Sequence, residues 1–276
     1  MKRELAKPFV KWVGGKRQLV PEIKKHIKLK SNTMYYEPFL GGGAVFLELQ
    51  PSNAIVNDYN AELINAYNVI KNDVEALIED LGKHKNDEIY FYNLREQDRY
   101  KDYHKVSNVE RASRLIYLNK TCFNGMYRVN SQGYFNVPFG KYKSPNIVNE
   151  FVLRELNAYF NEADIKFMSG DYEKSLIGIS KNSFVYFDPP YAPISTTSNF
   201  TGYTESGFDH KEQERLRNVC NDLNDQGVKF LLSNANVPSI QELYQDYNIE
   251  IVNAKRNINS IGTKRGLVEE VLIRNF

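Results

Sequence analysis

The sequence predicts an α/β protein in which a mostly parallel sheet is interrupted by a helical insertion. Strand and helix signals alternate over the first sixty residues and again after about residue 149, as expected for parallel strands joined by helices. Between these parts the alternation is replaced by helical periodicity and then by a loop rich in Asn, Gly and Pro. We therefore expect a core formed by residues 1–60 and 149–276 and a second domain formed by residues 61–148.

The N-terminal part of the core contains three segments with clear local signals. WVGGKRQLVPEIKKHI (12–27) begins with a Gly-Gly loop and continues as an amphipathic helix. MYYEPFLGGGAVFLEL (34–49) is an apolar strand, a glycine turn and a second helix. AIVNDYN (54–60) is a short strand that ends in a polar pair. These segments set the strand–helix order of the first half of the sheet.

The remaining elements follow in the same way. In the insertion we expect helices at 61–81, 88–100 and 108–123, and a hairpin or extended binding loop at 124–146. In the second half of the core we expect strands at 165–171, 183–187, 228–234, 249–252 and 269–276, with helices at 209–225 and 237–245. The sheet is thus completed by segments that follow the insertion.

Composition limits the class of protein. Apolar residues make up 42% and charged residues 25% of the 276 residues, which is typical of a soluble globular chain. The sequence has no apolar run of membrane-spanning length and no signal-peptide pattern at the N-terminus. Two cysteines give neither a disulfide framework nor zinc-ligand spacing, so we expect a cytoplasmic protein without a metal.

The charge distribution is more informative than the net charge of +2. Residues 111–143 hold six Lys or Arg, seven Tyr or Phe and no acidic residue, and the stretch 253–268 holds four more basic residues without an acid. Such segments can simply be solvated surface. A basic surface with interleaved aromatic residues is also what binding to a polyanion such as nucleic acid requires.

A glycine turn and a following acid form the first candidate site. The strand before Gly41–Gly43 would end at this turn, where glycine permits positive φ and close approach to the backbone, and a helix N-terminus follows. Asp58 ends the next strand, where a carboxylate can accept hydrogen bonds from the two hydroxyls of a ribose. The alternative is a plain turn with a helix-capping Asp. The combination favours a cofactor that contains a nucleoside.

The second candidate site is the corner FVYFDPPYAP (184–193). Asp188 would lie at the carboxyl end of a central strand, which is the ligand-binding edge of open α/β sheets. Pro189 and Pro190 have fixed φ and no N–H, so this corner offers a carboxylate and rigid carbonyl acceptors beside the ring of Tyr191. That set suits a flat group with an exocyclic amine, such as a nucleobase. Without the glycine turn, a strand-terminating turn would be the favoured interpretation of this corner.

Four motifs in order, FVKWVGGK, EPFLGGGAVF, NDYN and FDPPY, resemble the Dam-type adenine-N6 DNA methyltransferases. The resemblance covers nearly the whole chain and implies a Rossmann-like sheet that binds S-adenosylmethionine, with residues 61–148 as the DNA target-recognition domain. FNGMYRVN, FNVPFGKYK and SNFTGYTESGF are similar to the members that recognise GATC. The implied partner is double-stranded DNA, and we expect a monomer encoded by a bacterium or a phage.

The resemblance also implies residue roles. Residues matching the cofactor pocket are Trp12, Lys16, Glu37, Phe39, Gly41, Gly43, Asp58 and Asp188. Residues matching the catalytic corner are Asp188, Pro189, Pro190 and Tyr191. Residues matching DNA contacts are Lys11, Phe123, Asn124, Met126, Arg128, Pro138 and Tyr142. Phe123 departs from members that carry Tyr and would lose one hydroxyl contact, and at Tyr127 no particular residue type is expected.

This reading predicts a chemistry without metal or covalent intermediate. Asp188 and the Pro189 carbonyl would hold the two hydrogens of the adenine amine, and Tyr191 would stack on the base after it leaves the duplex. Two rival functions remain at this point. One is a non-catalytic nucleic-acid binder on a methyltransferase scaffold, which the intact motifs disfavour. The other is methylation of RNA or of a protein amine, which Asp188 and the basic insertion disfavour.

Overall fold

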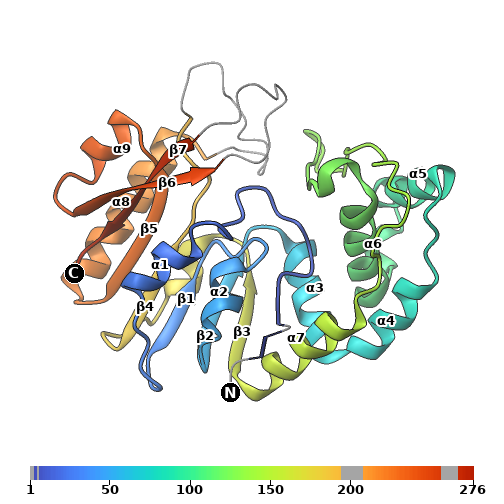
Figure 1. Cartoon of the computed structure of the whole chain (residues 1–276), viewed down its shortest axis with the longest axis horizontal. Helices are drawn as coiled ribbons and strands as arrows, with labels where there is room; N and C mark the ends of the chain where they lie inside the picture. The colour runs from blue at the N-terminus through green and yellow to red at the C-terminus, as the bar shows by residue number, and fades with distance from the viewer. Residues whose placement is uncertain (1–2, 5, 194–207, 256–266) are drawn as a thin grey trace.

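The computed structural model describes residues 3–4, 6–193, 208–255 and 267–276 (Figure 1). Most of the segment SNFTGYTESGF (198–208) and of the basic stretch 253–268 lies outside the described residues. Within the described ranges, no helix is both long and apolar enough to cross a membrane.

A seven-stranded sheet with the order β3-β2-β1-β4-β5-β7-β6 forms the centre of the protein. The strands are β1 (Met34–Glu37), β2 (Asn53–Asp58), β3 (Asp164–Ser169), β4 (Ser183–Phe187), β5 (Lys229–Ala235), β6 (Asn248–Lys255) and β7 (Leu267–Arg274). The first five are parallel, whereas β7 pairs antiparallel with both β5 and β6. The α/β class is confirmed, and the antiparallel pair at one edge modifies the expected parallel sheet.

Both faces of the sheet are covered by helices, because strand residues alternate between two apolar clusters. The helices on one face are α1 (Val20–His26), α2 (Ala44–Leu49), α3 (Ala61–Asn72) and α7 (Glu150–Glu162), and those on the other are α8 (His210–Asp225) and α9 (Pro238–Leu243). In the central strand β4, Phe184 and Tyr186 face the first set, whereas Val185 and Phe187 face the second. A strand buried on both faces explains the continuous apolar run of β4.

The insertion lies next to the β3 edge of the sheet, beside α7 (Figure 1). It contains α3, α4 (Val74–Gly82), α5 (Glu88–Glu96) and α6 (Asn108–Thr121), with short 3₁₀ turns at Gln97–Arg99, Tyr103–Lys105 and Phe123–Gly125. The single helix expected at 61–81 is two helices, because the backbone leaves helical geometry at Asp73 (φ −138°). Residues of α3, α4 and α6 belong to the same apolar cluster as the sheet residues Tyr35 and Val56.

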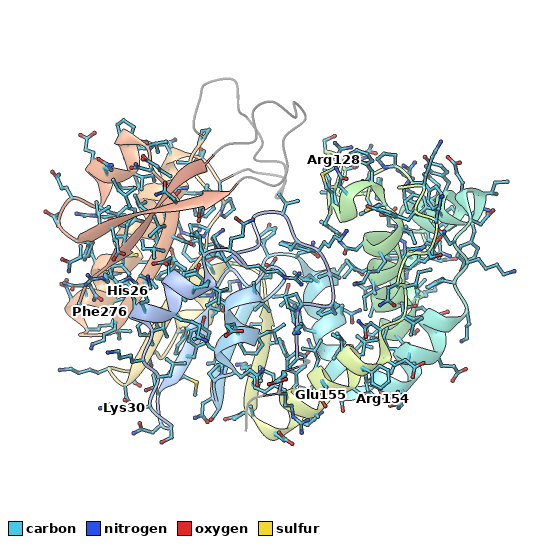
Figure 2. The ribbon with its side chains drawn as sticks, in the orientation of Figure 1. His26, Lys30, Arg128, Arg154, Glu155 and Phe276 are labelled. Carbon is cyan, nitrogen blue, oxygen red and sulfur yellow. The ribbon has the colours of Figure 1, made fainter. Side chains whose placement is uncertain are left out.

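The loop after α6 forms a hairpin over residues 128–136. Val129 pairs with Phe135 through a single bridge, and a second bridge joins Cys122 to Phe139. Cys122 and Cys220 are both buried, and burial raises the pKa of the Cys122 thiol to about 12. Figure 2 shows Arg128 at the end of the insertion opposite to Arg154, on the side of the molecule where the parallel strands end.

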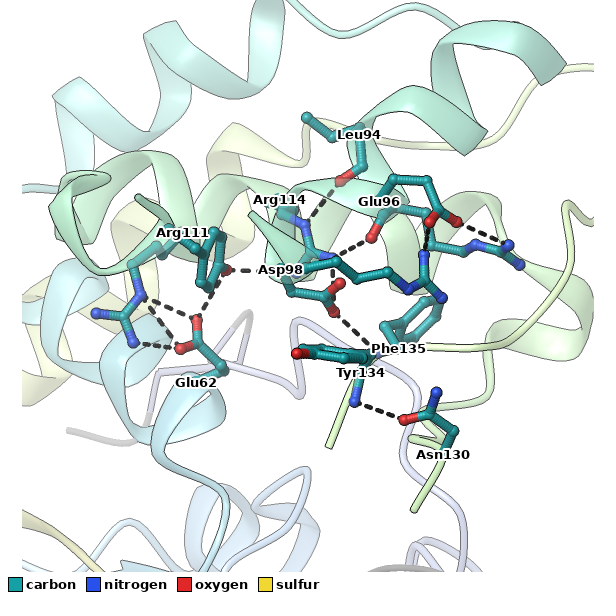
Figure 3. Close-up of polar contacts among 12 residues, drawn as sticks. Glu62, Leu94, Glu96, Asp98, Arg111, Arg114, Asn130, Tyr134 and Phe135 are labelled. Carbon is teal, nitrogen blue, oxygen red and sulfur yellow. Dashed lines mark hydrogen bonds and ion pairs between the residues drawn. The ribbon is translucent and has the colours of Figure 1, made fainter. Parts of the chain in front are cut away.

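A buried ion pair joins this hairpin to the helices of the insertion (Figure 3). Arg114 of α6 pairs with Asp98 at 2.9 Å and donates to the backbone carbonyls of Leu94 and Arg95. Asp98 in turn accepts the backbone N–H of Phe135 at 2.8 Å. The side chains of Arg114 and Asp98 are only 7% and 11% exposed. Asp98 therefore fixes the hairpin and satisfies a buried charge at once.

Replacing Asp98 by Ala is expected to lower the free energy of unfolding by about 3 kcal/mol, because breaking a buried ion pair leaves the partner charge uncompensated. This loss of stability is at the lower end of the range for broken buried ion pairs, because Arg114 keeps its two carbonyl acceptors. The exposed pair of Asp102 with Lys105 provides the control, and Asp102→Ala should change stability little. Urea unfolding of both variants measures the difference, and equal effects would contradict the assignment.

Candidate active site

Three carboxylates meet at the edge where the parallel strands end. Glu37 is the last residue of β1, Asp58 is the last residue of β2, and Asp188 directly follows β4. Because β1 pairs with both β2 and β4, these strand ends are neighbours in the sheet. The order of the strands therefore places the glycine turn and the DPPY corner at the same edge of the sheet.

Glu37 is the most buried of the three acids. It is 2% exposed, and the hydroxyl of Tyr35 donates to its Oε2 at 2.6 Å. Burial holds the pKa of Glu37 well above its usual range, while hydrogen bonds from Tyr35 and the backbone of Phe46 oppose the shift. The charge of Asp188 also raises this pKa, which indicates that the two acids are electrostatically connected.

Asp58 is fixed by two backbone amides. Gly41 N–H donates to Oδ2 at 2.8 Å, and Asn60 N–H donates to Oδ1 at 2.9 Å. Burial raises the pKa of Asp58, and both hydrogen bonds counteract the rise by favouring the carboxylate. The first of these bonds orients the glycine turn relative to β2, so the turn and the acid form one rigid unit.

The glycine turn is needed for the packing of Trp12. Gly41 has φ +50°, and a Cβ there would lie 2.8 Å from Cδ1 of the indole. Gly43 has φ +67°, and a Cβ there would lie 2.7 Å from the hydroxyl of Tyr67. Positive φ was expected from the sequence. The group that approaches Gly41 in this structure is a side chain of the protein itself, which closes one wall of the site.

Asp188 is held by a lysine and a serine. Lys16 Nζ lies 2.9 Å from Asp188 Oδ1, and Ser233 Oγ donates to the same oxygen at 3.0 Å. The Lys16 side chain is 7% exposed and also donates to the carbonyl of Gly14 at 2.6 Å. Burial raises the pKa of Asp188, whereas Lys16 and Ser233 oppose the rise. The positive charge of Lys16 therefore favours the ionised form of the Asp188 carboxylate.

The backbone after Asp188 is braced by buried polar side chains that the sequence did not reveal. Gln213 of α8 donates to the carbonyl of Pro190 at 3.0 Å, and Asn234 of β5 accepts the N–H of Ala192 at 3.1 Å. Asn234 also donates to Gln213 at 3.0 Å, so the two braces form one network. Their only sequence signal is the polar pair Ser233-Asn234 at the end of an apolar strand.

Two aromatic residues of the predicted site differ in their surroundings. The ring of Tyr191 lies 4.5 Å from Lys16 Nζ, and its hydroxyl donates to Glu270 of β7 at 2.6 Å. Phe39 contacts the rings of Tyr172 and Phe208 and packs against the cluster on the α8 face of the sheet. Tyr191 is thus oriented at both ends, by a cation and by a carboxylate.

The N-terminal segment is clasped to the insertion by Asn119 of α6. Asn119 accepts the N–H of Lys11 at 2.8 Å, donates to the carbonyl of Lys11 at 2.8 Å and donates to the carbonyl of Gly125 at 3.0 Å. Lys11 Nζ lies 5.7 Å from the ring centre of Tyr142. These contacts bring Lys11, Tyr142 and the turn before Met126 together although they are far apart in the sequence.

The other predicted DNA-contact residues lie on the loop and hairpin. Phe123 is 49% exposed, and Asn124 is exposed with φ +58°. Met126 and Pro138 lie in the same loop system, where the Pro138 carbonyl accepts the N–H of Phe123 at 2.8 Å. Arg128 is exposed, and its Nε donates to Asn136 across the hairpin at 2.7 Å. The hairpin therefore presents a guanidinium group that is already oriented.

Tyr127, where no particular residue type was expected, contacts Trp12 of the predicted cofactor pocket. Its ring stacks on Trp12 with the ring centres 5.1 Å apart and an interplanar angle of 21°. The sequence contained no signal for this contact, because the stack joins two segments more than a hundred positions apart. The stack adds a second connection between the N-terminal segment and the insertion.

Within the described ranges, no three His, Cys, Asp or Glu side chains form a group that could hold a metal ion.

The sequence profile of the family described as "D12 class N6 adenine-specific DNA methyltransferase" matches residues 12–258. The chain is 46% identical to "Type II methyltransferase M1.LlaDCHI" of Lactococcus lactis subsp. cremoris, over 98% of this chain and 95% of that relative.

Two further relatives extend the comparison. "Type II methyltransferase M.MjaIII" of Methanocaldococcus jannaschii is 40% identical, over 98% of this chain and 99% of the relative. "DNA adenine methylase" of Vibrio cholerae serotype O1 is 34% identical, over 99% of this chain and 96% of the relative. The similarity therefore covers the core and the insertion together.

Replacing Gly41 by Ala is expected to displace Trp12, because the added Cβ would contact the indole and the positive φ would be strained. We expect a loss of about 1–3 kcal/mol in stability and a shift in tryptophan emission, which reports Trp12 alone because the chain has one Trp. Gly178→Ala is the control, since Gly178 has φ +78° but open space around the Cβ position. An unshifted emission spectrum for Gly41→Ala would argue against this packing.

Proposed function

Because this chain belongs to the D12 class of N6 adenine-specific DNA methyltransferases, we propose that Asp188 and the Pro189 carbonyl hold the amine of the target adenine. The chain is an enzyme that methylates adenine N6 at specific sites in DNA, and family membership implies S-adenosylmethionine as the methyl donor. The observation that carries the proposal is the position of Asp188, a braced carboxylate at the ligand edge of the sheet.

The contacts of Asp188 suggest how its two oxygens divide their roles. Lys16 and Ser233 both contact Oδ1, so we assign Oδ2 to the adenine amine. The Pro189 carbonyl takes the second amine hydrogen, whereas the Pro190 carbonyl has a structural role because it accepts from Gln213. Two acceptors at N6 direct the nitrogen lone pair away from the ring, and the carboxylate stabilises the positive charge that develops on N6.

The residues around Asp58 fit a cofactor that contains a nucleoside. The carboxylate is oriented by Gly41 and Asn60, and a carboxylate so placed can accept hydrogen bonds from both hydroxyls of a ribose. We propose that Asp58, Trp12, Phe39 and the Gly41–Gly43 turn hold the cofactor, with Lys16 and Glu37 supporting the site from within. The cofactor supplies a methyl group already activated as a sulfonium, so the protein mainly aligns the reacting atoms.

The adenine must leave the duplex to reach Asp188, at a cost of a few kcal/mol. We propose that Tyr191 stacks on the extruded base, which offsets about 1–3 kcal/mol of that cost. Its contacts with Lys16 and Glu270 limit the motion of the ring, so less side-chain freedom is lost when the base arrives.

We further propose that residues 61–148 recognise the target and that the target is GATC. Arg128 would read a guanine through O6 and N7, with Lys11, Phe123, Asn124, Met126, Pro138 and Tyr142 as the other contacts. The hydrogen bond from Arg128 to Asn136 supports this role by orienting the guanidinium group. The enzyme is proposed to act as a cytoplasmic monomer and to need no metal.

Asp188→Ala and Asp188→Asn should each lower the rate of methyl transfer to duplex DNA at least about 100-fold, because a preorganised charge at the reacting nitrogen is lost. The affinity of each variant for the duplex should stay within a few fold of the wild-type value, because the extruded base is the one part of the DNA that Asp188 is proposed to contact. Transfer of a labelled methyl group and a gel-shift titration measure the two quantities. Near-normal turnover in either variant would refute the role of Asp188.

The GATC assignment is tested by digesting DNA that has been exposed to the enzyme with nucleases blocked by, or dependent on, methylated GATC. Protection from the first and cleavage by the second is expected, and unchanged digestion by both would refute GATC.

Arg128→Ala should reduce discrimination at one guanine by about 1–3 kcal/mol. Lys143→Ala is the control, because Lys143 is an exposed lysine of the same basic segment that is not among the proposed base contacts, and its loss should weaken binding to all sequences alike.

A further inference from the structure

The recognition hairpin and the cofactor pocket meet at one side chain. Tyr127 directly precedes Arg128, and its ring stacks on Trp12 at 5.1 Å. The indole of Trp12 rests against the backbone of Gly41, and Gly41 N–H donates to Asp58. A continuous series of contacts therefore runs from the hairpin to the carboxylate that we assign to the ribose.

The hydroxyl of Tyr127 provides a second path to the same carboxylate. The Asn60 side chain is near enough to this hydroxyl to lower its pKa, and Asn60 N–H donates to Asp58 Oδ1 at 2.9 Å. Burial raises the pKa of Tyr127 to about 12, so the phenol is neutral at physiological pH. The ring and the hydroxyl of one residue thus reach both hydrogen-bonded sides of Asp58.

On its other side, Tyr127 contacts the hairpin. Its ring contacts Phe135 at 5.7 Å, and the N–H of Phe135 is held by Asp98. A cavity of about 200 Å³ lies here, and its lining includes Tyr127, Asp98, Arg114 and Phe135. This space allows the Tyr127 ring to shift when the hairpin engages a duplex, and such a shift changes what Trp12 packs against.

We propose that Tyr127 is a positioning residue that couples recognition of the DNA site to binding of the cofactor. The inference rests on the function proposed above and extends it. Binding of the hairpin to its correct target shifts the Tyr127 ring against Trp12, and this shift favours the arrangement of Gly41 and Asp58 that binds the cofactor. Coupling between two sites is reciprocal, so bound cofactor must favour the correct target by the same factor.

The direct test is calorimetry of S-adenosylhomocysteine binding to the whole protein, alone and with a duplex that carries the methylated site. The wild-type protein should bind this product more tightly with the duplex, by a factor within the usual range of about 5- to 150-fold for coupled sites. A duplex with the site scrambled should give a factor near one. Equal affinity with and without the correct duplex would overturn the proposal.

Variants separate the stack from general hairpin stability. Tyr127→Leu should reduce the coupling factor to less than about twofold, whereas Tyr127→Phe, which keeps the ring, should retain most of it. Tyr134→Leu is the matched control, because Tyr134 lies in the same hairpin and packs against Arg99. An unchanged factor in Tyr127→Leu, or an equal loss in Tyr134→Leu, would overturn the proposal.

The fluorescence of the single tryptophan gives a second measurement, which is made on the wild-type protein and does not depend on the folding of a variant. Adding the correct duplex without cofactor should change the emission of Trp12, and an unchanged spectrum would overturn the proposal. Methyl transfer by the wild-type protein is measured first. If the wild-type protein transfers no methyl group, the proposed function is wrong. If the wild-type protein transfers normally and Tyr127→Leu keeps the full coupling factor, only this inference is wrong.

Discussion

The ion pair between Lys16 and Asp188 is the contact on which the arrangement of the site depends. Parallel strands bring Glu37, Asp58 and Asp188 to one edge of the sheet, where burial raises the pKa of each. A buried cluster of acids is costly unless charges and donors offset it. Lys16 supplies the cation, and because it lies on the N-terminal segment, the pairing draws that segment across the sheet edge. Trp12 and Lys11 reach their positions as a consequence.

The N-terminal segment then links chemistry and recognition. One end of it is fixed to Asp188 through Lys16, and the other is clasped by Asn119 of the insertion. Trp12 lies between these fixed points and contacts both the glycine turn and the hairpin. A short loop thus sets the distance between the two parts of the enzyme. Its rigidity derives from backbone hydrogen bonds and one ion pair, with little contribution from secondary structure.

Local patterns in the sequence were sufficient to predict what depends on local chemistry. The apolar run before Asp188 and the short strand before Asp58 gave the strand ends and therefore the two acids. The break at Asp73 was not predicted because the apolar periodicity continues across it, and the reversed direction of β7 was not predicted because it depends on pairing with β5 and β6. Gln213, Asn234 and Tyr127 were also missed. Each acts through a partner far away in the chain, which no spacing rule identifies.

The apolar cluster that continues from the sheet through α3, α4 and α6 bears on how such enzymes change specificity. A target-recognition domain attached as an independent module could be exchanged as a unit between related enzymes. Here the helices that carry the reading loop share their interior with the catalytic scaffold, so a transplanted insertion would bring mismatched packing into the core. Evolution of new targets in this architecture is therefore expected to proceed by substitution in the exposed loop, with the helices below retained.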